Sequence, residues 1–221
     1  ALTHKQLVIL FANGNDAEDG DGNGEIDENS MLWEATAKNS ISIGASENYR
    51  PSRGPAADNA EGMASFSGRG PTEDGRIKPD FVAPGTHIYS TKSRAAGPAA
   101  SSCGWGSDSS ITDYCFMGGT SMATPIAAGA TALLLEHLIE NEGVVDPTSY
   151  LVKAILGAST TDMAGQFGSP TNGAGEAIPN MHEGNGRLNM YSAVQTSFVH
   201  NESLSTTCLL YTSPSPRDNT T

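Results

Sequence analysis

The sequence has few cations, few cysteines and no long apolar run, and each shortage argues against a class of protein. Lysine and arginine together number 12 against 25 carboxylates, which gives a formal net charge of −13. Nucleic-acid binding needs a basic surface, so nucleic acid is not an expected partner. No apolar run approaches the roughly 20 residues that span a bilayer, and no membrane span is expected. No charged leader followed by an apolar core is visible at the first residues, so no signal peptide is recognisable in this fragment.

What the chain does have is the composition of a globular protein. Hydrophobic residues make up 37% and charged residues 17% of its 221 residues, enough for one domain with a sizeable core. The 25 glycines and 12 prolines predict many loops and tight turns. Of the three cysteines, Cys103 and Cys115 flank a Gly/Ser-rich stretch. They fit a disulfide in an oxidising compartment and a pair of free thiols about equally well.

The C-terminal residues form a segment of a different kind. From Cys208 to Asp218, eleven consecutive residues resemble the translation of a transposase adaptor used to prepare sequencing libraries. The alternative is a Ser/Pro-rich disordered tail. Both interpretations predict that residues 208–221 contribute neither structure nor function. Under the first, the natural protein continues beyond Thr207 with a sequence of its own.

Short apolar runs bounded by turn residues predict the strands of the fold. They fall at residues 6–12, 40–45, 80–83, 87–90 and 114–117. The first is a continuous apolar run that ends in Asn13-Gly14-Asn15. Such a run is typical of a strand buried on both faces of a parallel sheet.

Two helices are predicted in the second half of the chain. From Ser121 to about Ile139, apolar residues recur with a helical period over a wide face, which predicts a buried central helix. Asp146 and Pro147 predict the N-cap and first position of another helix, which ends near Ala158. Alternating strands and helices indicate an α/β protein with a mostly parallel sheet flanked by helices.

The most informative serine is Ser121. It follows Gly118-Gly119-Thr120 and opens the long helix, so the unpaired N–H groups of a helix start lie beside it. Such groups can stabilise an oxyanion, and the glycines let the backbone approach a substrate carbonyl. The local pattern alone fits a capping serine as well as a nucleophile.

The run Gly119-Thr120-Ser121-Met122-Ala123-Thr124-Pro125 resembles the serine motif of the subtilases. Four further segments agree with that family in order and spacing, namely 11–15, 37–45, 66–85 and 184–189. The resemblance implies a subtilisin-like α/β fold in which residues 1–200 are the C-terminal portion of the catalytic domain. The sequence from Arg69 to Asp80 is most similar to that of the oxidatively stable alkaline proteases, which carry a C-terminal jelly-roll domain. Residues 201–207 are then the start of that missing domain, or a linker.

The resemblance also implies a serine endopeptidase that acts on protein or peptide substrates. Ser121 is the expected nucleophile, and Asn15 is the expected oxyanion-hole amide. Asn13 is the rival for that second role by composition, and it stands where the family usually has alanine beside the primary specificity pocket. The substrate is expected to contact the residues around these positions: Ala12, Asn13, Gly14, Gly119 and Thr120.

What is missing limits the activity expected of this chain. The family order is Asp, His, Asn, Ser, with the first two well upstream of the oxyanion Asn. Only His4 precedes Asn15, and the other histidines follow it, at His87, His137, His182 and His200. Without a base and its orienting carboxylate, the fragment itself is expected to be close to inert. The alternatives are a subtilase-fold module that binds peptide without cleaving it and an extracellular calcium-binding module.

An acidic loop follows Asn15 and has the donor spacing of a calcium loop. Position 6 is glycine, and position 12 is Ser30 in place of the usual bidentate Glu. The alternative is a solvated acidic loop. Together with the serine motif, the loop predicts a secreted, calcium-stabilised enzyme. The candidate ligands are Asp19, Asp21, Asn23, Glu25 and Asp27.

Overall fold

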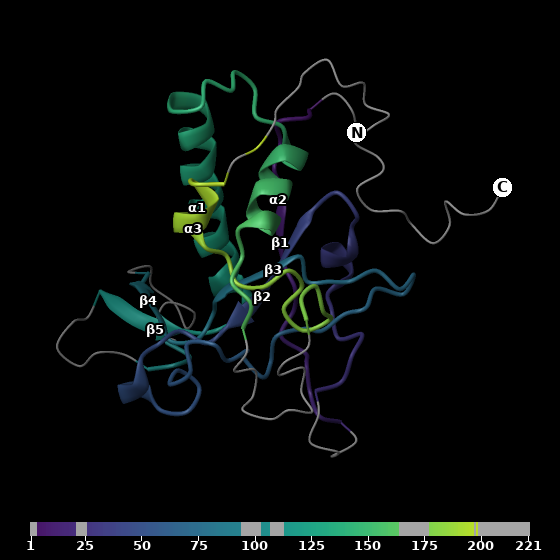
Figure 1. Cartoon of the computed structure of the whole chain (residues 1–221). Coiled ribbons are helices and arrows are strands. Elements are labelled where there is room, and N and C mark those ends of the chain that lie inside the picture. The colour runs from purple at the N-terminus through teal and green to yellow at the C-terminus, as the bar shows by residue number, and fades with distance from the viewer. Residues whose placement is uncertain are drawn as a thin grey trace.

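The computed structural model describes residues 4–20, 26–93, 103–106, 113–163, 177–196 and 198. Along these ranges the strands all precede the three α-helices (Figure 1). The strands are β1 (Leu10–Ala12), β2 (Ile41–Ser46), β3 (Phe81–Pro84), β4 (Ile88–Thr91) and β5 (Tyr114–Met117). The helices are α1 (Thr120–Glu140), α2 (Ser149–Ala158) and α3 (Met190–Ala193), with short 3-10 turns η1 (Trp33–Thr36) and η2 (Pro51–Arg53).

The central element is a parallel sheet in the order β1-β2-β3. Leu10 is aligned with Ile41, and Ile43 is aligned with Phe81. Residues 186–188 continue the ladder beyond β3, because the Val82 N–H donates to the carbonyl of Gly186. Strands β4 and β5 form a separate antiparallel pair. The predicted α/β class and the parallel sheet are therefore confirmed.

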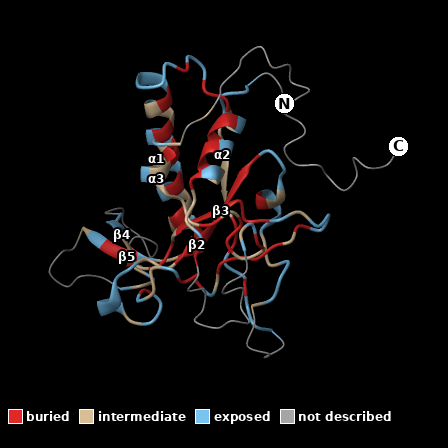
Figure 2. Cartoon of the chain, in the orientation of Figure 1, coloured by how far each residue is buried: buried red, intermediate tan, exposed pale blue. Residues whose placement is uncertain are grey.

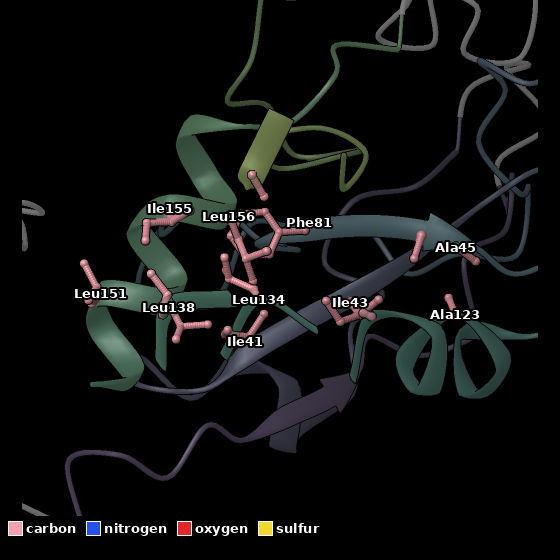
Figure 3. Close-up of a cluster of buried hydrophobic side chains, with 14 of the residues drawn as sticks. Ile41, Ile43, Ala45, Phe81, Ala123, Leu134, Leu138, Leu151, Ile155 and Leu156 are labelled. Atoms are coloured by element: carbon pink, nitrogen blue, oxygen red, sulfur yellow. The ribbon is translucent and has the colours of Figure 1, made fainter. Parts of the chain in front are cut away.

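Alternation along β2 and β3 divides the core into two layers. Side chains of a strand point alternately to opposite faces, and the odd-numbered residues of β2 and β3 pack against α1, α2 and α3. Figure 3 shows side chains from these strands and helices meeting in one cluster. On the opposite face, Val82 packs with Met63 and Met163. All three described helices thus cover one face of the sheet.

Helix α1 lies against all three strands of the sheet. Its buried residues recur at helical spacing and are Thr120, Ala123, Ala127, Thr131, Leu134 and Leu138. The predicted central helix is therefore present, but its buried face is narrower than its apolar pattern, because Ile126, Leu133 and Ile139 are exposed. Figure 2 shows both buried and exposed residues along α1. On length and composition alone α1 could cross a membrane, but its packing is that of a core helix.

Two further predictions need correction. The first strand covers Leu10–Ala12 only, and Leu7 and Ile9 are exposed because β1 is an edge strand of the described sheet. The second predicted helix begins later than expected. Thr148 caps α2, with its hydroxyl accepting a hydrogen bond from the N–H of Leu151. A threonine at the N-cap satisfies one of the donors that a helix start leaves open.

The amino ends of β2 and β3 hold a buried network of charges. Asp80, just before β3, accepts hydrogen bonds from the Nζ of Lys78 at 2.6 Å and from the backbone N–H of Ser42 at 2.8 Å. Its other carboxylate oxygen lies 2.7 Å from the Nζ of Lys153 on α2. Both ammonium groups also donate to the carbonyl of Ser40. Burial lowers the pKa of Lys78, and the negative charge of Asp80 opposes that shift.

Candidate active site

The site lies at the other end of the sheet, where the carboxyl ends of the parallel strands meet the start of α1. The Gly119 N–H donates to the carbonyl of Gly85, which follows β3, at 2.8 Å. The Gly85 N–H in turn donates to the carbonyl of Ser46 at the end of β2, also at 2.8 Å. Loops after parallel strands gather at one edge of a sheet, which is where α/β proteins commonly bind ligands.

Gly119 sets the direction in which α1 begins. Its φ of 143° lies where only glycine is comfortable. Its carbonyl accepts hydrogen bonds from the N–H groups of Met122 at 2.9 Å and Ala123 at 3.3 Å. Two of the donors in the first turn are therefore already satisfied by the backbone.

Asn15, which follows β1, is fastened to the same turn. Its Oδ1 accepts hydrogen bonds from the N–H of Thr120 at 2.8 Å and from the Thr120 hydroxyl at 3.0 Å. Because a backbone N–H can only donate, the amide oxygen must face Thr120. The Nδ2 group therefore faces away from Thr120 and stays able to donate. The buried Thr120 hydroxyl also accepts from the N–H of Gly14 at 3.2 Å, which joins β1 to α1.

Ser121 is exposed at the first turn of α1. The neighbouring N–H groups are occupied: that of Thr120 by Asn15, and those of Met122 and Ala123 by Gly119. The Ser121 N–H has no acceptor within the described ranges. A free helix N–H next to an exposed hydroxyl and the Asn15 amide can bind a developing negative charge.

The described histidines do not supply a base for Ser121, since none forms a hydrogen bond with it. His87 packs edge-on against Trp105, with ring centroids 4.6 Å apart. Burial, assisted by Arg53 and Arg50, lowers the pKa of His87. His137 on α1 lies 3.4 Å from Glu142.

Of the other two described histidines, His4 is exposed and His182 lies beside Arg69. Burial, assisted by that cation, lowers the pKa of His182 to about 4. The carbonyl of His182 accepts a hydrogen bond from the Arg69 guanidinium at 3.2 Å. This environment keeps the His182 imidazole neutral near pH 7, and it lies away from Ser121.

Comparison with known proteins assigns the chain to a family. A profile described as the Subtilase family matches residues 2–186. The chain belongs to the subtilase family. Serine protease/ABC transporter B family protein tagB of Dictyostelium discoideum is 38% identical over 126 residues, which are 53% of this chain and 6% of that protein.

Solved structures agree with this assignment of the subtilase fold. The CspB protease of Clostridium perfringens is 26% identical, with a TM-score of 0.52 over 75% of this chain and 28% of its own. Fervidolysin of Fervidobacterium pennivorans, a keratinolytic enzyme related to subtilisin, is 20% identical, with a TM-score of 0.56 over 88% of this chain and 23% of its own; at that identity the likeness concerns the fold alone. The chain spans about a quarter of the length of these two proteins.

The other subtilase substrate positions predicted from sequence lie around the same edge. Ala12 is half-buried and Gly14 is buried. Asn13 is fully buried, and its Nδ2 donates to the carbonyl of Gly68 at 2.5 Å. Its side chain is therefore directed into the protein, whereas the Asn15 side chain reaches the start of α1.

An aromatic group near the site was not foreseen from the sequence. Trp105 lies edge-on to Phe66, with ring centroids 6.0 Å apart, and to His87. Its indole covers Gly118, where an added Cβ would overlap the ring. The only available signal was a single tryptophan in a Gly/Ser-rich stretch that otherwise reads as a surface excursion.

The predicted calcium loop is only partly described. Asp21, Asn23 and Glu25 lie outside the described residues, so their geometry does not enter the site. The two ends of the loop come together, because the Asp27 carboxylate accepts from the N–H of Gly20 at 3.0 Å and the Asp27 N–H donates to Glu18 at 2.8 Å. Across the described ranges no cluster of three or more acidic, His or Cys side chains is arranged to hold a metal.

Proposed function

We propose that this chain is the nucleophile-bearing portion of a serine endopeptidase of the subtilase family. The observation that carries the proposal is the joint placement of Ser121 and Asn15. An exposed hydroxyl, a free N–H and an oriented amide converge at one helix start. A serine that served only as a cap would not need an amide from another strand held beside it.

In the proposed reaction, Ser121 Oγ attacks the peptide carbonyl as its proton passes to a histidine base. The negative charge on the carbonyl oxygen is stabilised by the Ser121 N–H and the Asn15 Nδ2. Collapse of this intermediate breaks the C–N bond, and the histidine returns the proton to the leaving amine. Water then attacks the acyl-serine through the same base, releasing the acid and restoring Ser121.

We propose that the base and its aspartate come from subtilase sequence preceding this segment. Two exposed apolar surfaces, on the β1 side of the described sheet and on α1, support this assignment. Leu7 and Ile9 are exposed at 59% and 45% beside the free edge of β1. Ile126 and Leu133 are exposed at 39% and 59% on α1, which starts at Ser121. A neighbouring strand and helix would cover these surfaces and carry the two missing groups to the site.

The proposal is tested with a fluorophosphonate probe on a form of the protein that includes the preceding sequence. Active-site serines react because a base activates them. We expect one equivalent of label on the peptide that contains Ser121 and none in Ser121→Ala. Label that persists in Ser121→Ala would exclude Ser121 as the nucleophile. A longer protein that folds but takes up no label would favour the alternative, a subtilase-fold module that binds peptides without cleaving them.

We also propose that the acidic loop binds calcium as a structural ion. The donor spacing from Asp19 to Asp27 and the closed base of the loop support this proposal. Carboxylates and carbonyls at such spacing suit Ca²⁺ better than Mg²⁺, which gives up its water reluctantly. We expect chelation to lower the melting temperature by several degrees, and Asp21→Ala to abolish that effect. An unchanged melting curve would show that the loop is merely solvated.

Two finer expectations belong with this proposal. A secreted or extracellular location fits a calcium-stabilised subtilase. The sequence between Arg69 and Asp80 favours membership of the alkaline protease group that has a C-terminal jelly-roll domain. Complete coding sequence on both sides of the segment tests both expectations, together with the proposed artefactual origin of residues 208–221.

A further inference from the structure

We propose that Cys103 and Cys115 form a dithiol that can close to a disulfide and so clamp the Trp105 indole over Gly118. The proposal concerns a modification site next to the nucleophile and does not depend on catalysis. It rests on the backbone pairing that brings the two cysteines near one another and on the packing of Trp105.

The backbone brings Cys103 against strand β5. The turn that begins at Cys103 is closed by a hydrogen bond from the Gly106 N–H to the Cys103 carbonyl at 3.1 Å. The Phe116 carbonyl accepts from the N–H of Trp105 at 3.2 Å, and the Phe116 N–H donates to Gly106 at 2.9 Å. Two hydrogen bonds to one residue hold the turn beside the neighbouring Cys115.

The two cysteine side chains lie near one another. Cys103 is partly exposed and Cys115 is buried, and both are reduced in this structure. Interaction with the Cys103 side chain, together with burial, raises the pKa of Cys115, while Lys92 opposes the shift. A disulfide needs the Cβ atoms to approach within about 4.5 Å, and the turn that begins at Cys103 is already paired with Phe116, the residue after Cys115.

The turn held in this way carries Trp105, which lies near the nucleophile. Trp105 is two residues after Cys103, and its indole covers Gly118, three residues before Ser121. Within the described residues, Trp105 is joined to β5 by one backbone hydrogen bond and to Phe66 and His87 by ring contacts. A covalent bond from Cys103 to β5 would therefore fix the indole relative to Gly118.

The chemistry is a thiol–disulfide exchange with a small-molecule disulfide as oxidant. The more exposed Cys103 attacks as a thiolate, breaks the S–S bond of the oxidant and releases one small thiol. Cys115 then attacks the Cys103 sulfur of the mixed disulfide and releases the second. Two protein thiols are oxidised, one small disulfide is reduced, and both protons pass to the released thiolates.

The experiment equilibrates the full chain in buffers of reduced and oxidised glutathione, in a Cys208→Ser background that leaves only these two thiols. Peptide mapping should find a Cys103–Cys115 bond. Its equilibrium constant should be at least ten times larger under native conditions than in guanidinium, because the fold pre-positions the thiols. Equal constants in the two solvents, or only mixed and intermolecular disulfides, would overturn the proposal.

A second measurement follows the clamp itself. In a Trp33→Phe background Trp105 is the sole tryptophan, and oxidation should lower its quenching by acrylamide about two-fold. Cys103→Ser is the matched control, because it removes the bond at the partly exposed position and should abolish the change. A disulfide that forms without altering Trp105 quenching would contradict the clamp. Neither readout uses peptidase activity, so the proposed function stands or fails separately.

Discussion

The amino ends and the carboxyl ends of the strands in the three-stranded sheet, called here its amino edge and its carboxyl edge, are built in opposite ways. At the amino edge, the charges of Lys78 and Asp80 are 3% and 10% exposed and are paired with each other and with backbone groups. At the carboxyl edge, Ser121 and Asn15 are exposed, and each keeps a donor that faces no described acceptor. One edge satisfies its polar groups, whereas the other leaves donors open, as the proposed active site requires.

This difference predicts which edge contributes to stability and which contributes to the proposed function. A buried charge that loses its partner is costly, so the amino edge should respond to substitution by unfolding. An exposed donor contributes little to the folded state, so the carboxyl edge should respond by losing chemistry. Functional sites commonly keep such unsatisfied groups at some cost in stability. Substitutions at each edge can break this comparison or sharpen it.

The largest expected effect is on turnover at the carboxyl edge. In a form that includes the preceding sequence, and on the proposed function, Ser121→Ala should lower kcat by about 10⁶-fold, the scale measured for the nucleophile of subtilisin itself. Its free energy of unfolding should change by less than about 0.5 kcal/mol, because the side chain is exposed. Peptide hydrolysis and denaturant unfolding measure the two quantities. A large loss of stability would show that Ser121 is a structural cap.

The next effect is on stability at the amino edge. Asp80→Ala leaves the buried ammonium of Lys78 without its counter-charge and should destabilise the fold by about 3–5 kcal/mol. Urea unfolding measures this change. The matched control is Asp74→Ala, which removes an exposed ion pair with Arg76 and should change stability far less. Equal losses in the two variants would contradict the importance of the buried network.

Substitutions of Asn15 can separate the hydrogen bond that its Oδ1 accepts from Thr120 from the oxyanion contact proposed for its Nδ2. Asn15→Ala should lower kcat by about 10²–10³-fold with little change in KM, as expected for a lost oxyanion donor. Asn15→Asp keeps an acceptor for the Thr120 N–H but lacks the Nδ2 donor. It should therefore retain the stability of the wild type and lose comparable activity. Full activity in Asn15→Asp would exclude Nδ2 as an oxyanion ligand.

The smallest effect is a pH dependence of stability at His182. Its pKa is about 4 when folded, against 6.5 for the free side chain, so the unfolded chain binds the extra proton between these values. Stability is therefore complete above pH 6.5 and falls by about 2–3 kcal/mol as the pH drops toward 4. His182→Gln should flatten that slope in urea titrations, and His4→Gln, at an exposed position, should not. A slope unchanged in His182→Gln would contradict the burial of the imidazole.

The sequence predicted the elements well where local pattern and tertiary environment agree. Strand β5 and helix α1 lie within a residue of their predicted bounds, because a short apolar run bounded by turn residues and a helical apolar period are clear local signals. The first strand was overextended, since an apolar run does not show which strand stands at a sheet edge. The cap of α2 was placed at Asp146 instead of Thr148, because both residues are good caps and only the packing of the chain chooses between them.

Within the proposed site, the sequence predicts residues but not their contacts. Ser121 and Asn15 are 106 positions apart, and only the meeting of β1 with α1 brings them to one helix turn. The orientation of the Asn15 amide depends on its hydrogen bond with Thr120, which no linear pattern encodes. Trp105 was missed for the same reason, because its position over Gly118 arises from pairing between two segments.

The most direct measurement traps the acyl-enzyme. The longer protein is mixed with an activated ester, quenched in acid within milliseconds and digested for mass spectrometry. The account predicts a single acyl group on the peptide that contains Ser121, with a smaller amplitude in Asn15→Asp and none in Ser121→Ala. An acyl group on any other residue, or turnover with no acyl group on Ser121, would contradict the central claim that this helix start carries the nucleophile.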